Sequence, residues 1–222
     1  MKSQHQVVLS LGSNQGQRLE TIIQCIDVLH LEVGTVLKIS PVYESPAWGF
    51  ESTPFYNCAL VLHTNASPTQ VLNKILKIEK RLGRVRTGTV GYAARSIDID
   101  IIAYDEIVLD TEKLQLPHPL MQDRNFVLLP FRDLQLNWIH PIFKKSVPEL
   151  IAETTDNSIC QAVATIPAPL SSIPLEKFNY IAFEGNIGAG KTTLTNKIAE
   201  DFNAKTVLER FADNPFLPKF YK

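Results

Sequence analysis

The order of apolar patterns along the first 105 residues constrains the fold more than any other feature of this chain. Apolar runs and apolar–polar alternation predict strands, and apolar residues three or four positions apart predict helices. The predicted strands cover residues 7–11, 36–43, 55–64 and 96–104, and the predicted helices cover 16–31, 68–81 and 126–134. The order β-α-β-β-α-β is the ferredoxin-like split βαβ arrangement, so we expect an α+β sandwich.

A change in composition divides the chain into two parts. Residues 165–174 read TIPAPLSSIP, a stretch rich in proline and serine that favours an extended linker. We therefore predict a first domain over 1–165, a linker over 166–177 and a second segment over 178–222.

Charge and cysteine content limit the classes of function. The formal net charge is −1 at pH 7, which argues against a broad basic surface for nucleic acid or a membrane. The cysteines Cys25, Cys58 and Cys160 form no C-x-x-C pair and are odd in number, which favours a reducing compartment. No segment approaches the roughly 20 apolar residues of a membrane span. We expect a soluble, cytoplasmic protein with no nucleic-acid and no membrane partner.

Two aspartates on one predicted strand form the first candidate site. Residues i and i+2 of a strand point to the same face, so Asp98 and Asp100 face one way and Ile99 faces the core. Two neighbouring carboxylates repel each other, and a divalent cation such as Mg²⁺ removes that cost. The alternative interpretation is a solvated strand face that binds nothing.

Cationic side chains flank this strand in the sequence. They are Arg84, Arg86, Arg95, His118 and Arg124. Arginine binds phosphate oxygens with two parallel hydrogen bonds, so cations beside paired carboxylates favour Mg²⁺–nucleotide chemistry. Any one of these arginines taken singly is more often an ordinary surface charge.

Several short motifs occur together within residues 7–150. They are L-G-S-N at 11–14, S-P-V-Y-E-S-P at 40–46, F-Y-N-C-A at 55–59, I-E-K-R-L-G-R-V-R at 78–86, R-S-I-D-I-D-I-I at 95–102 and L-P-H-P-L-M-Q-D-R-N-F-V-L-L-P-F at 116–131. In these motifs and in their order the chain resembles the dihydropterin pyrophosphokinase family. That family transfers the β,γ-pyrophosphoryl group of ATP to 6-hydroxymethyl-7,8-dihydropterin in folate biosynthesis and releases AMP.

The resemblance implies a role for each matching residue. Asp98 and Asp100 would hold two Mg²⁺ ions, with ATP as co-substrate. The ATP-binding residues would be Glu79, Arg84, Arg86, Arg95, His118 and Arg124, of which Arg84 and Arg95 would also act in catalysis. The pterin-binding residues would be Ser45, Pro46, Trp48, Phe55, Asn57 and Phe126. The partners would be these small molecules, and the pyrophosphokinase domain would be monomeric.

Physical chemistry supports this pterin pocket without requiring it. A flat heterocycle packs well on the aromatic faces of Phe55 and Phe126, and its polar edge suits the side-chain amide of Asn57. The alternative is that both rings belong to the core and that Asn57 is an ordinary strand residue.

The chain departs from the family pattern in two places. Many members have R-W-G-P-R before the aspartate strand, whereas this chain reads V-G-Y-A-A-R at 90–95. The tryptophan that covers the site in those members is missing, and Tyr92 is the candidate replacement. Pro119 follows His118, where some relatives have an aromatic residue.

A second motif lies in the C-terminal segment. Residues 185–192 read G-N-I-G-A-G-K-T, and they follow a predicted strand at 178–184 and open a predicted helix, as a phosphate-binding P-loop does. Gly185, Gly188 and Gly190 would let backbone N–H groups cradle phosphates, Lys191 would reach the β- and γ-phosphates, and Thr192 would contact Mg²⁺. The alternative is a glycine-rich turn.

Residues 178–222 also resemble the start of the deoxynucleoside kinases. The resemblance rests on E-G-N-I-G-A-G-K-T-T-L at 184–194 and L-E-R-F-A-D-N-P-F-L-P-K-F-Y at 208–221. It implies that Glu209 would accept the proton of the sugar hydroxyl. These 45 residues are too few for a parallel α/β P-loop kinase domain, so we predict its truncated start.

Two other functions stay open on the sequence alone. In one, nucleoside phosphorylation is the main activity and the first domain is an accessory; its product would be ADP rather than AMP. In the other, the first domain is a nucleotide-binding module without catalytic activity.

Overall fold

The computed structural model of the chain describes residues 4–84, 94–169, 179–185 and 189–208. The chain divides into two compact units, Met1–Ile173 and Pro174–Lys222. Four residues of the sequence analysis, Arg86, Tyr92, Gly188 and Glu209, lie outside the described residues.

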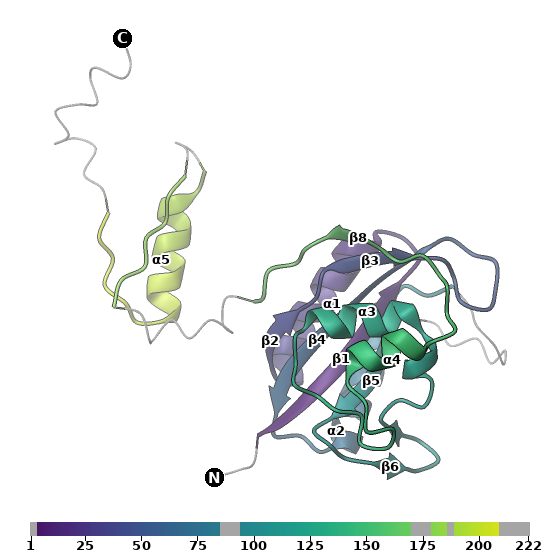
Figure 1. Ribbon diagram of the computed structural model, residues 1–222. Helices are drawn as coiled ribbons and strands as arrows, with labels where there is room; N and C mark the ends of the chain where they lie inside the picture. Colours follow the sequence, from purple (N-terminus) through teal and green to yellow (C-terminus); the bar gives the residue numbers. More distant parts are fainter. Residues whose placement is uncertain (1–3, 85–93, 170–178, 186–188, 209–222) are drawn as a thin grey trace. The chain divides into compact units, whose positions relative to one another are not determined.

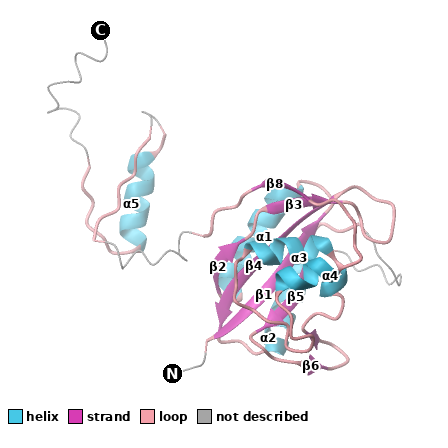
Figure 2. Ribbon diagram, viewed as in Figure 1, coloured by secondary structure: helices cyan, strands magenta, loops and turns pink. Residues whose placement is uncertain are grey.

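An antiparallel sheet forms the centre of the first unit (Figures 1 and 2). Its strands are β1 (His5–Ser13), β2 (Thr35–Ile39), β3 (Val42–Ser45), β4 (Phe55–Thr64), β5 (Asp98–Tyr104) and β8 (Gln161–Ala164). The spatial order is β5-β1-β4-β3-β8, and β2 also pairs with β4. Strand β4 is antiparallel to both β2 and β3.

Helices cover both faces of the sheet (Figure 1). Helices α1 (Arg18–Glu32) and α2 (Pro68–Arg81) pack on one face around side chains such as Leu9, Ile26 and Ile75. Helices α3 (Asn125–Asp133) and α4 (Val147–Glu153) pack on the other face, over Val8 and Val61. A 3-10 helix η1 (Met121–Asp123) and a hairpin of β6 (Leu109–Asp110) and β7 (Gln115–Leu116) connect β5 to α3.

Local signals explain the start of α2. Ser67 is the N-cap residue, and its hydroxyl accepts a hydrogen bond from the Gln70 N–H. The Gln70 side chain in return accepts one from the Ser67 N–H at 2.8 Å. This capping box satisfies two N–H groups that have no partner within the helix. The buried face carries Val71, Ile75 and Ile78, and burial of each such side chain contributes about 1.5–3 kcal/mol.

The α+β fold and most of its elements are predicted correctly from the sequence. The strand at 55–64 and the helix at 68–81 match β4 and α2. The single strand predicted over 36–43 is wrong, because β2 ends at Ile39 and β3 begins at Val42. The cause is local: Pro41 has no N–H to donate, and the Ser40 hydroxyl accepts from the Ala59 N–H instead.

Several short elements have no counterpart in the sequence prediction. They are β6, β7, η1, α4 and β8, of which the longest is the seven-residue α4. Elements of two to seven residues are too short to show a recognisable periodicity of apolar residues. Strand β8 nevertheless extends the sheet, since Tyr43 of β3 pairs with Ala162.

The second unit contains one described helix, α5 (Lys191–Asp201). The strand predicted over 178–184 is not formed in the described part of that range, residues 179–184. A parallel strand needs a neighbour to pair its N–H and C=O groups, and the described residues of this unit supply none. In the described residues of both units, no helix combines the length and apolarity of a membrane-spanning segment.

Candidate active site

One face of the sheet changes from apolar to polar along its length. Under α3 and α4 this face carries apolar residues such as Val8 and Val61. Further along the strands it carries Ser10 and Gly12 on β1, Phe55 and Asn57 on β4, and Asp98 and Asp100 on β5. The register pairs Gly12 with Asn57 on one side and with Asp98 on the other. The sheet therefore holds an amide and a carboxylate on either side of a residue that has no side chain.

A cavity of about 270 Å³ opens above this polar end of the sheet. Besides the six sheet residues just named, its walls come from β3 and the loop after it, from Arg95, and from the segment between β7 and α3. These further residues are Ser45, Pro46, Trp48, Phe50, Arg95, His118, Pro119, Leu120, Arg124 and Phe126. The structure thus brings all six predicted pterin residues and both aspartates around one space.

Aromatic rings form one side of the cavity, and a buried amide lies among them. The Trp48 and Phe126 ring centroids are 6.1 Å apart, and Phe50 meets Phe55 edge-to-face at 6.3 Å. Asn57 is 3% exposed, and its Nδ2 donates to the Ser45 hydroxyl at 2.8 Å. That bond fixes the amide plane and leaves the Asn57 oxygen facing Gly12. Such a lining suits a flat heterocycle with a polar edge.

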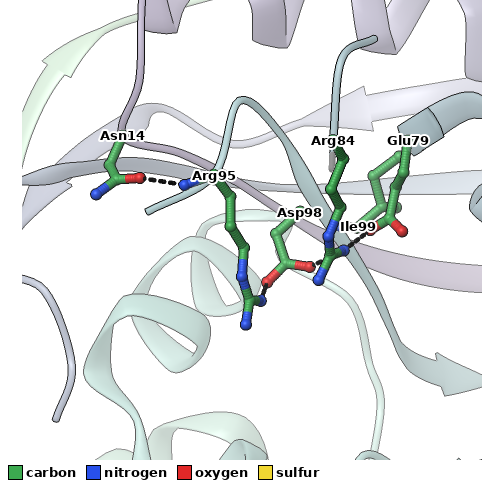
Figure 3. A network of polar contacts seen from close by, with 6 residues as sticks. All are labelled: Asn14, Glu79, Arg84, Arg95, Asp98 and Ile99. Carbon is green, nitrogen blue, oxygen red and sulfur yellow. Dashed lines mark hydrogen bonds and ion pairs between the residues drawn. The ribbon is translucent and has the colours of Figure 1, made fainter. Parts of the chain in front are cut away.

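Charged groups at the start of β5 form a connected network (Figure 3). The two oxygens of Asp98 form separate ion pairs, one with Arg84 and the other with Arg95. Arg84 also pairs with Glu79, a carboxylate that is 2% exposed. Glu79 in addition accepts the Ile99 N–H at 3.0 Å. The network anchors the main chain between the two aspartates.

Asp100 differs from Asp98 in its partners. Within the described residues its carboxylate makes no hydrogen bond or ion pair, and it borders the cavity beside Asp98. Burial, and then the neighbouring Asp98 charge, raise the pKa of Asp100 to about 7. A half-buried carboxylate without a partner is costly as an anion, and a cation would remove this cost.

Comparison with known proteins identifies the family. The family model 7,8-dihydro-6-hydroxymethylpterin-pyrophosphokinase (HPPK) matches residues 8–136, the stretch that contains both aspartates and the cavity. This chain belongs to the HPPK family.

Curated relatives support the HPPK assignment. The Aquifex aeolicus 2-amino-4-hydroxy-6-hydroxymethyldihydropteridine pyrophosphokinase is 41% identical over 155 residues, 69% of this chain and 95% of that protein. The Porphyromonas gingivalis enzyme of the same name is 39% identical over 138 residues, 61% of this chain and 93% of that protein. The match to the Pneumocystis carinii folic acid synthesis protein fol1, at 36% identity, spans 69% of this chain and 20% of that much longer protein.

A solved structure agrees in fold. The HPPK-DHPS structure determined in complex with substrates superposes with a TM-score of 0.55 at 13% identity. The match covers 67% of this chain and 43% of that one. The activity follows from the family and its relatives: the HPPK domain transfers a pyrophosphoryl group from ATP to hydroxymethyldihydropterin in folate biosynthesis.

A second cavity of about 540 Å³ adjoins the first in the HPPK domain. It shares Asp100, His118 and Pro119 with the first cavity. Its other walls come from α2, β5 and the β6–β7 hairpin, and they are Leu72, Ile99, Ile101, Asp110, Thr111, Glu112, Lys113, Leu114 and Gln115. The two spaces therefore meet beside the aspartates.

His118 lies where the two cavities meet. Burial, and then the positive charge of Arg124, lower the pKa of His118 to about 4. Its Nδ1 accepts the Leu120 N–H at 3.2 Å, so the neutral ring carries its proton on Nε2. His118 is therefore a neutral hydrogen-bond donor at pH 7.

The structure separates the predicted nucleotide residues into two groups. Arg95, His118 and Arg124 line the first cavity. Glu79 and Arg84 line neither cavity; Arg84 pairs with Asp98, and Glu79 pairs with Arg84. Sequence reasoning missed Ser10, Gly12, Phe50 and Leu120 of the first cavity and the residues that line only the second one. The L-G-S-N motif was a signal for Gly12; the two-residue strands of the hairpin gave none.

Proposed function

We propose that the smaller cavity binds the pterin and that the larger one binds the nucleotide. The observation that carries this assignment is the meeting of an aromatic and a polar cavity beside Asp98 and Asp100. The pterin ring would lie against the rings of Phe55, Trp48 and Phe126, and its polar edge would pair with Asn57. The hydroxymethyl group would then point toward the aspartates, where the ATP phosphates enter.

Asp98 and Asp100 fit a magnesium site. Mg²⁺ favours one or two carboxylates completed by water and substrate phosphates. Among the described residues Asp100 has no hydrogen-bond or ion-pair partner, and its pKa is raised to about 7. No cluster of three ligating side chains occurs within the described residues, so phosphate oxygens would complete the coordination. We propose two ions, which would neutralise the charge on the transferring phosphates.

The cationic residues then stabilise charge during transfer. Arg84 and Arg95 neutralise Asp98 in the protein described here, and a bound cation would release them toward the phosphates. His118 lies on the wall shared by the two cavities, and Arg124 lines the smaller one. The Arg124 guanidinium and the Nε2–H of His118 would donate to phosphate oxygens. Arg86 is proposed as a further phosphate contact and Glu79 as a residue that acts through Arg84. Positioning and charge stabilisation of this kind suffice for phosphoryl transfer.

Binding measurements with a matched pair of asparagine variants test this assignment. Asn57→Ala removes the buried amide, whereas Asn73→Ala removes an exposed asparagine on α2. We expect Asn57→Ala to raise the Kd of 6-hydroxymethylpterin about tenfold or more, since a buried polar edge loses its partner. The Kd of Mg²⁺-ATP should stay the same in both variants. An unchanged pterin Kd in Asn57→Ala contradicts the pocket assignment.

We also propose that residues 178–222 form a deoxynucleoside kinase-like P-loop segment. The support is local: α5 begins at Lys191 directly after Gly190, which has φ of +77°. Lys191 Nζ donates to the Gly185 carbonyl at 2.5 Å, so the motif's lysine contacts the residue that opens the motif. Thr192 lies in the first turn of α5, and Glu209 is the proposed base.

Deletion of residues 170–222 tests the role of this segment. We expect AMP formation from ATP and the reduced pterin to be unchanged by the deletion, because both cavities lie within residues 10–126. The full chain should release no ADP when given deoxynucleosides. Nucleoside-dependent ADP release would instead favour nucleoside phosphorylation as a second activity, and absence of AMP formation would favour the non-catalytic module.

We propose further that the HPPK domain acts as a monomer in the cytoplasm. The cysteines Cys25, Cys58 and Cys160 are all unpaired thiols, as a reducing compartment favours. Sedimentation equilibrium of the purified chain tests the monomer, and a species of twice the chain mass would contradict it.

A further inference from the structure

Asn14, at the end of β1, makes hydrogen bonds to two segments that are distant in the sequence. Its Nδ2 donates to the Ser52 hydroxyl at 3.0 Å and to the Thr53 carbonyl at 3.2 Å. Its Oδ1 accepts the Arg95 N–H at 2.7 Å, a bond drawn in Figure 3. Asn14 is 4% exposed, so these bonds are shielded from water.

The main chain of Asn14 repeats the same two connections. The Asn14 N–H donates to the Arg95 carbonyl at 3.1 Å. The Asn14 carbonyl accepts from the Thr53 hydroxyl at 2.7 Å. Residue 14 thus holds one segment through Arg95 and the other through Ser52 and Thr53.

Each of these segments carries groups that line the smaller cavity. The loop at 46–54 supplies Trp48 and Phe50 to its aromatic side. Arg95 lines the same cavity with its guanidinium, which pairs with Asp98. Asn14 lines neither of the two cavities described above, so it would act through the residues that it holds.

The side chain at position 14 must both donate and accept. An amide does this with one group, since its nitrogen has two N–H bonds and its oxygen accepts. Aspartate keeps the acceptor for the Arg95 N–H and loses both donors to the loop. Alanine loses all three side-chain bonds. The position can therefore be dissected one connection at a time.

We propose that Asn14 is a positioning residue that couples the pterin-binding loop to Arg95, so that a bound nucleotide strengthens pterin binding and the reverse. The inference rests on the assignment of the two cavities proposed above. A bound phosphate would order the Arg95 side chain and, with it, the Arg95 main chain. The Arg95 N–H is hydrogen-bonded to Asn14. Asn14 is hydrogen-bonded to Thr53 in the pterin-binding loop. Coupling is reciprocal by thermodynamic necessity, and typical values are about fivefold or more in affinity.

Two residues provide one-sided controls. Arg18 of α1 holds the same loop at its base, donating to the Pro54 carbonyl at 2.7 Å and to Glu44 at 3.0 Å. The Ser13 hydroxyl holds the other segment alone, donating to the Ser96 carbonyl at 2.6 Å. Within the described residues neither side chain makes a hydrogen bond to both segments, so Arg18→Met and Ser13→Ala weaken one side each.

The experiment is a binding cycle on the full chain in Mg²⁺. The pterin probe is 6-hydroxymethylpterin and the nucleotide probe is α,β-methylene-ATP, in which the bond to be broken is blocked. The coupling factor is the Kd of the pterin without the nucleotide divided by its Kd with the nucleotide. We expect a factor of about five or more for the wild type. Asn14→Ala and Asn14→Asp should have a clearly smaller factor, because only the main chain of residue 14 then holds the loop.

The controls separate coupling from general damage. Arg18→Met should weaken pterin binding by the same factor with and without nucleotide, and Ser13→Ala should leave the coupling factor at the wild-type value. Asn14→Asp is nearly isosteric, so it answers the question if Asn14→Ala does not fold. Wild-type coupling in a folded Asn14→Asp variant overturns the proposal, as does a factor of one in the wild type.

Failure of the pocket assignment has a different signature. If the pterin binds elsewhere, Asn57→Ala leaves the pterin Kd unchanged whatever the coupling factor is. If the pocket is right and Asn14 has only a structural role, Asn57→Ala weakens binding and both Asn14 variants keep the wild-type coupling factor.

Discussion

The two cavities that meet beside Asp98 and Asp100 are built in different ways. The smaller one stands on the paired strands β1, β3, β4 and β5, and its amide Asn57 is already hydrogen-bonded and buried. The larger one borders the short β6–β7 hairpin, where Thr111, Glu112 and Lys113 are exposed. A site fixed by strand register is formed before its ligand arrives, whereas a site bordered by an exposed turn adjusts to it.

This contrast predicts that substitutions affect ligand affinity differently in the two cavities. The preformed cavity selects the ring by shape and by one buried amide, and it loses much affinity from small changes of shape. The open cavity contacts the nucleotide over a wider and more polar surface, so any single contact contributes less. Substitutions should therefore have their largest effects where the cavities meet, smaller effects in the preformed cavity and the smallest in the open one.

Asp100→Asn should produce the largest effect. It keeps the shape of the side chain and removes the charge that would hold the cation, so kcat for AMP formation should fall by roughly a thousandfold. Without Mg²⁺ at pH 8, the free energy of unfolding of the variant should equal or exceed that of the wild type. The reason is that the native state disfavours the charged Asp100 carboxylate, as its pKa of about 7 indicates. Urea unfolding and AMP release measure the two quantities.

Asp27→Asn is the matched control, since Asp27 is exposed on α1. It should leave AMP formation unchanged. A turnover of Asp100→Asn within tenfold of the wild type would remove Asp100 from the metal site.

Gly12→Ala should disturb the preformed cavity. A methyl group at this position would lie 3.0 Å from Asn57 Oδ1 and 3.7 Å from Phe55 Cδ1. Overpacking of this kind costs about 1–3 kcal/mol, so the KM for the pterin should rise roughly tenfold while that for ATP changes little. Gly12→Val should have a larger effect in the same direction. Equal effects on both KM values would contradict the separation of the two cavities.

The sequence predicts the preformed cavity much better than the open one. The apolar patterns of 55–64 and 68–81 predict β4 and α2, and alternation places Asp98 and Asp100 on one face. The motifs then supply Asn57 and Phe126. The β6–β7 hairpin has two residues in each strand, so nothing in its pattern distinguishes it from a loop.

Contacts across long sequence separations set the second limit. Asn14 lies 38 residues from Ser52 and 81 from Arg95, and each bond depends on how β1 pairs with its neighbours. The sequence also predicts arginines near phosphates. It does not predict that Arg84 and Arg95 form ion pairs with Asp98 in the protein without ligands. Such pairings follow from tertiary packing and not from local preference.

Leu72→Ala should affect the open cavity modestly. Leu72 lies on α2 and lines only this cavity, so loss of its apolar contact with the nucleotide should raise the KM for ATP about three- to fivefold. The pterin KM should not change. Leu76→Ala, one turn further along α2 and 37% exposed, removes the same side chain outside the cavity and should leave both KM values unchanged. A larger pterin effect than ATP effect in Leu72→Ala would reverse the assignment.

His118→Gln keeps an N–H donor, so its effect should appear in the pH dependence of stability. The native state lowers the pKa of His118 from 6.5 to about 4 because the ring is largely buried and Arg124 is near. The unfolded chain therefore binds a proton at this site near pH 6.5, whereas the native state does so only near pH 4. Stability is complete above pH 6.5 and is lost progressively as the pH falls from 6.5 to 4.

Glutamine does not titrate, so the variant should lose less stability than the wild type over that interval. Urea midpoints at pH 7.5 and pH 4.5 measure the difference in the metal-free protein. The KM for ATP of the wild type should show no step near pH 6.5 arising from this ring, since His118 is neutral on both sides of that value. An equal acid-induced loss in both proteins would mean that His118 is accessible to water and is not part of the wall between the two cavities.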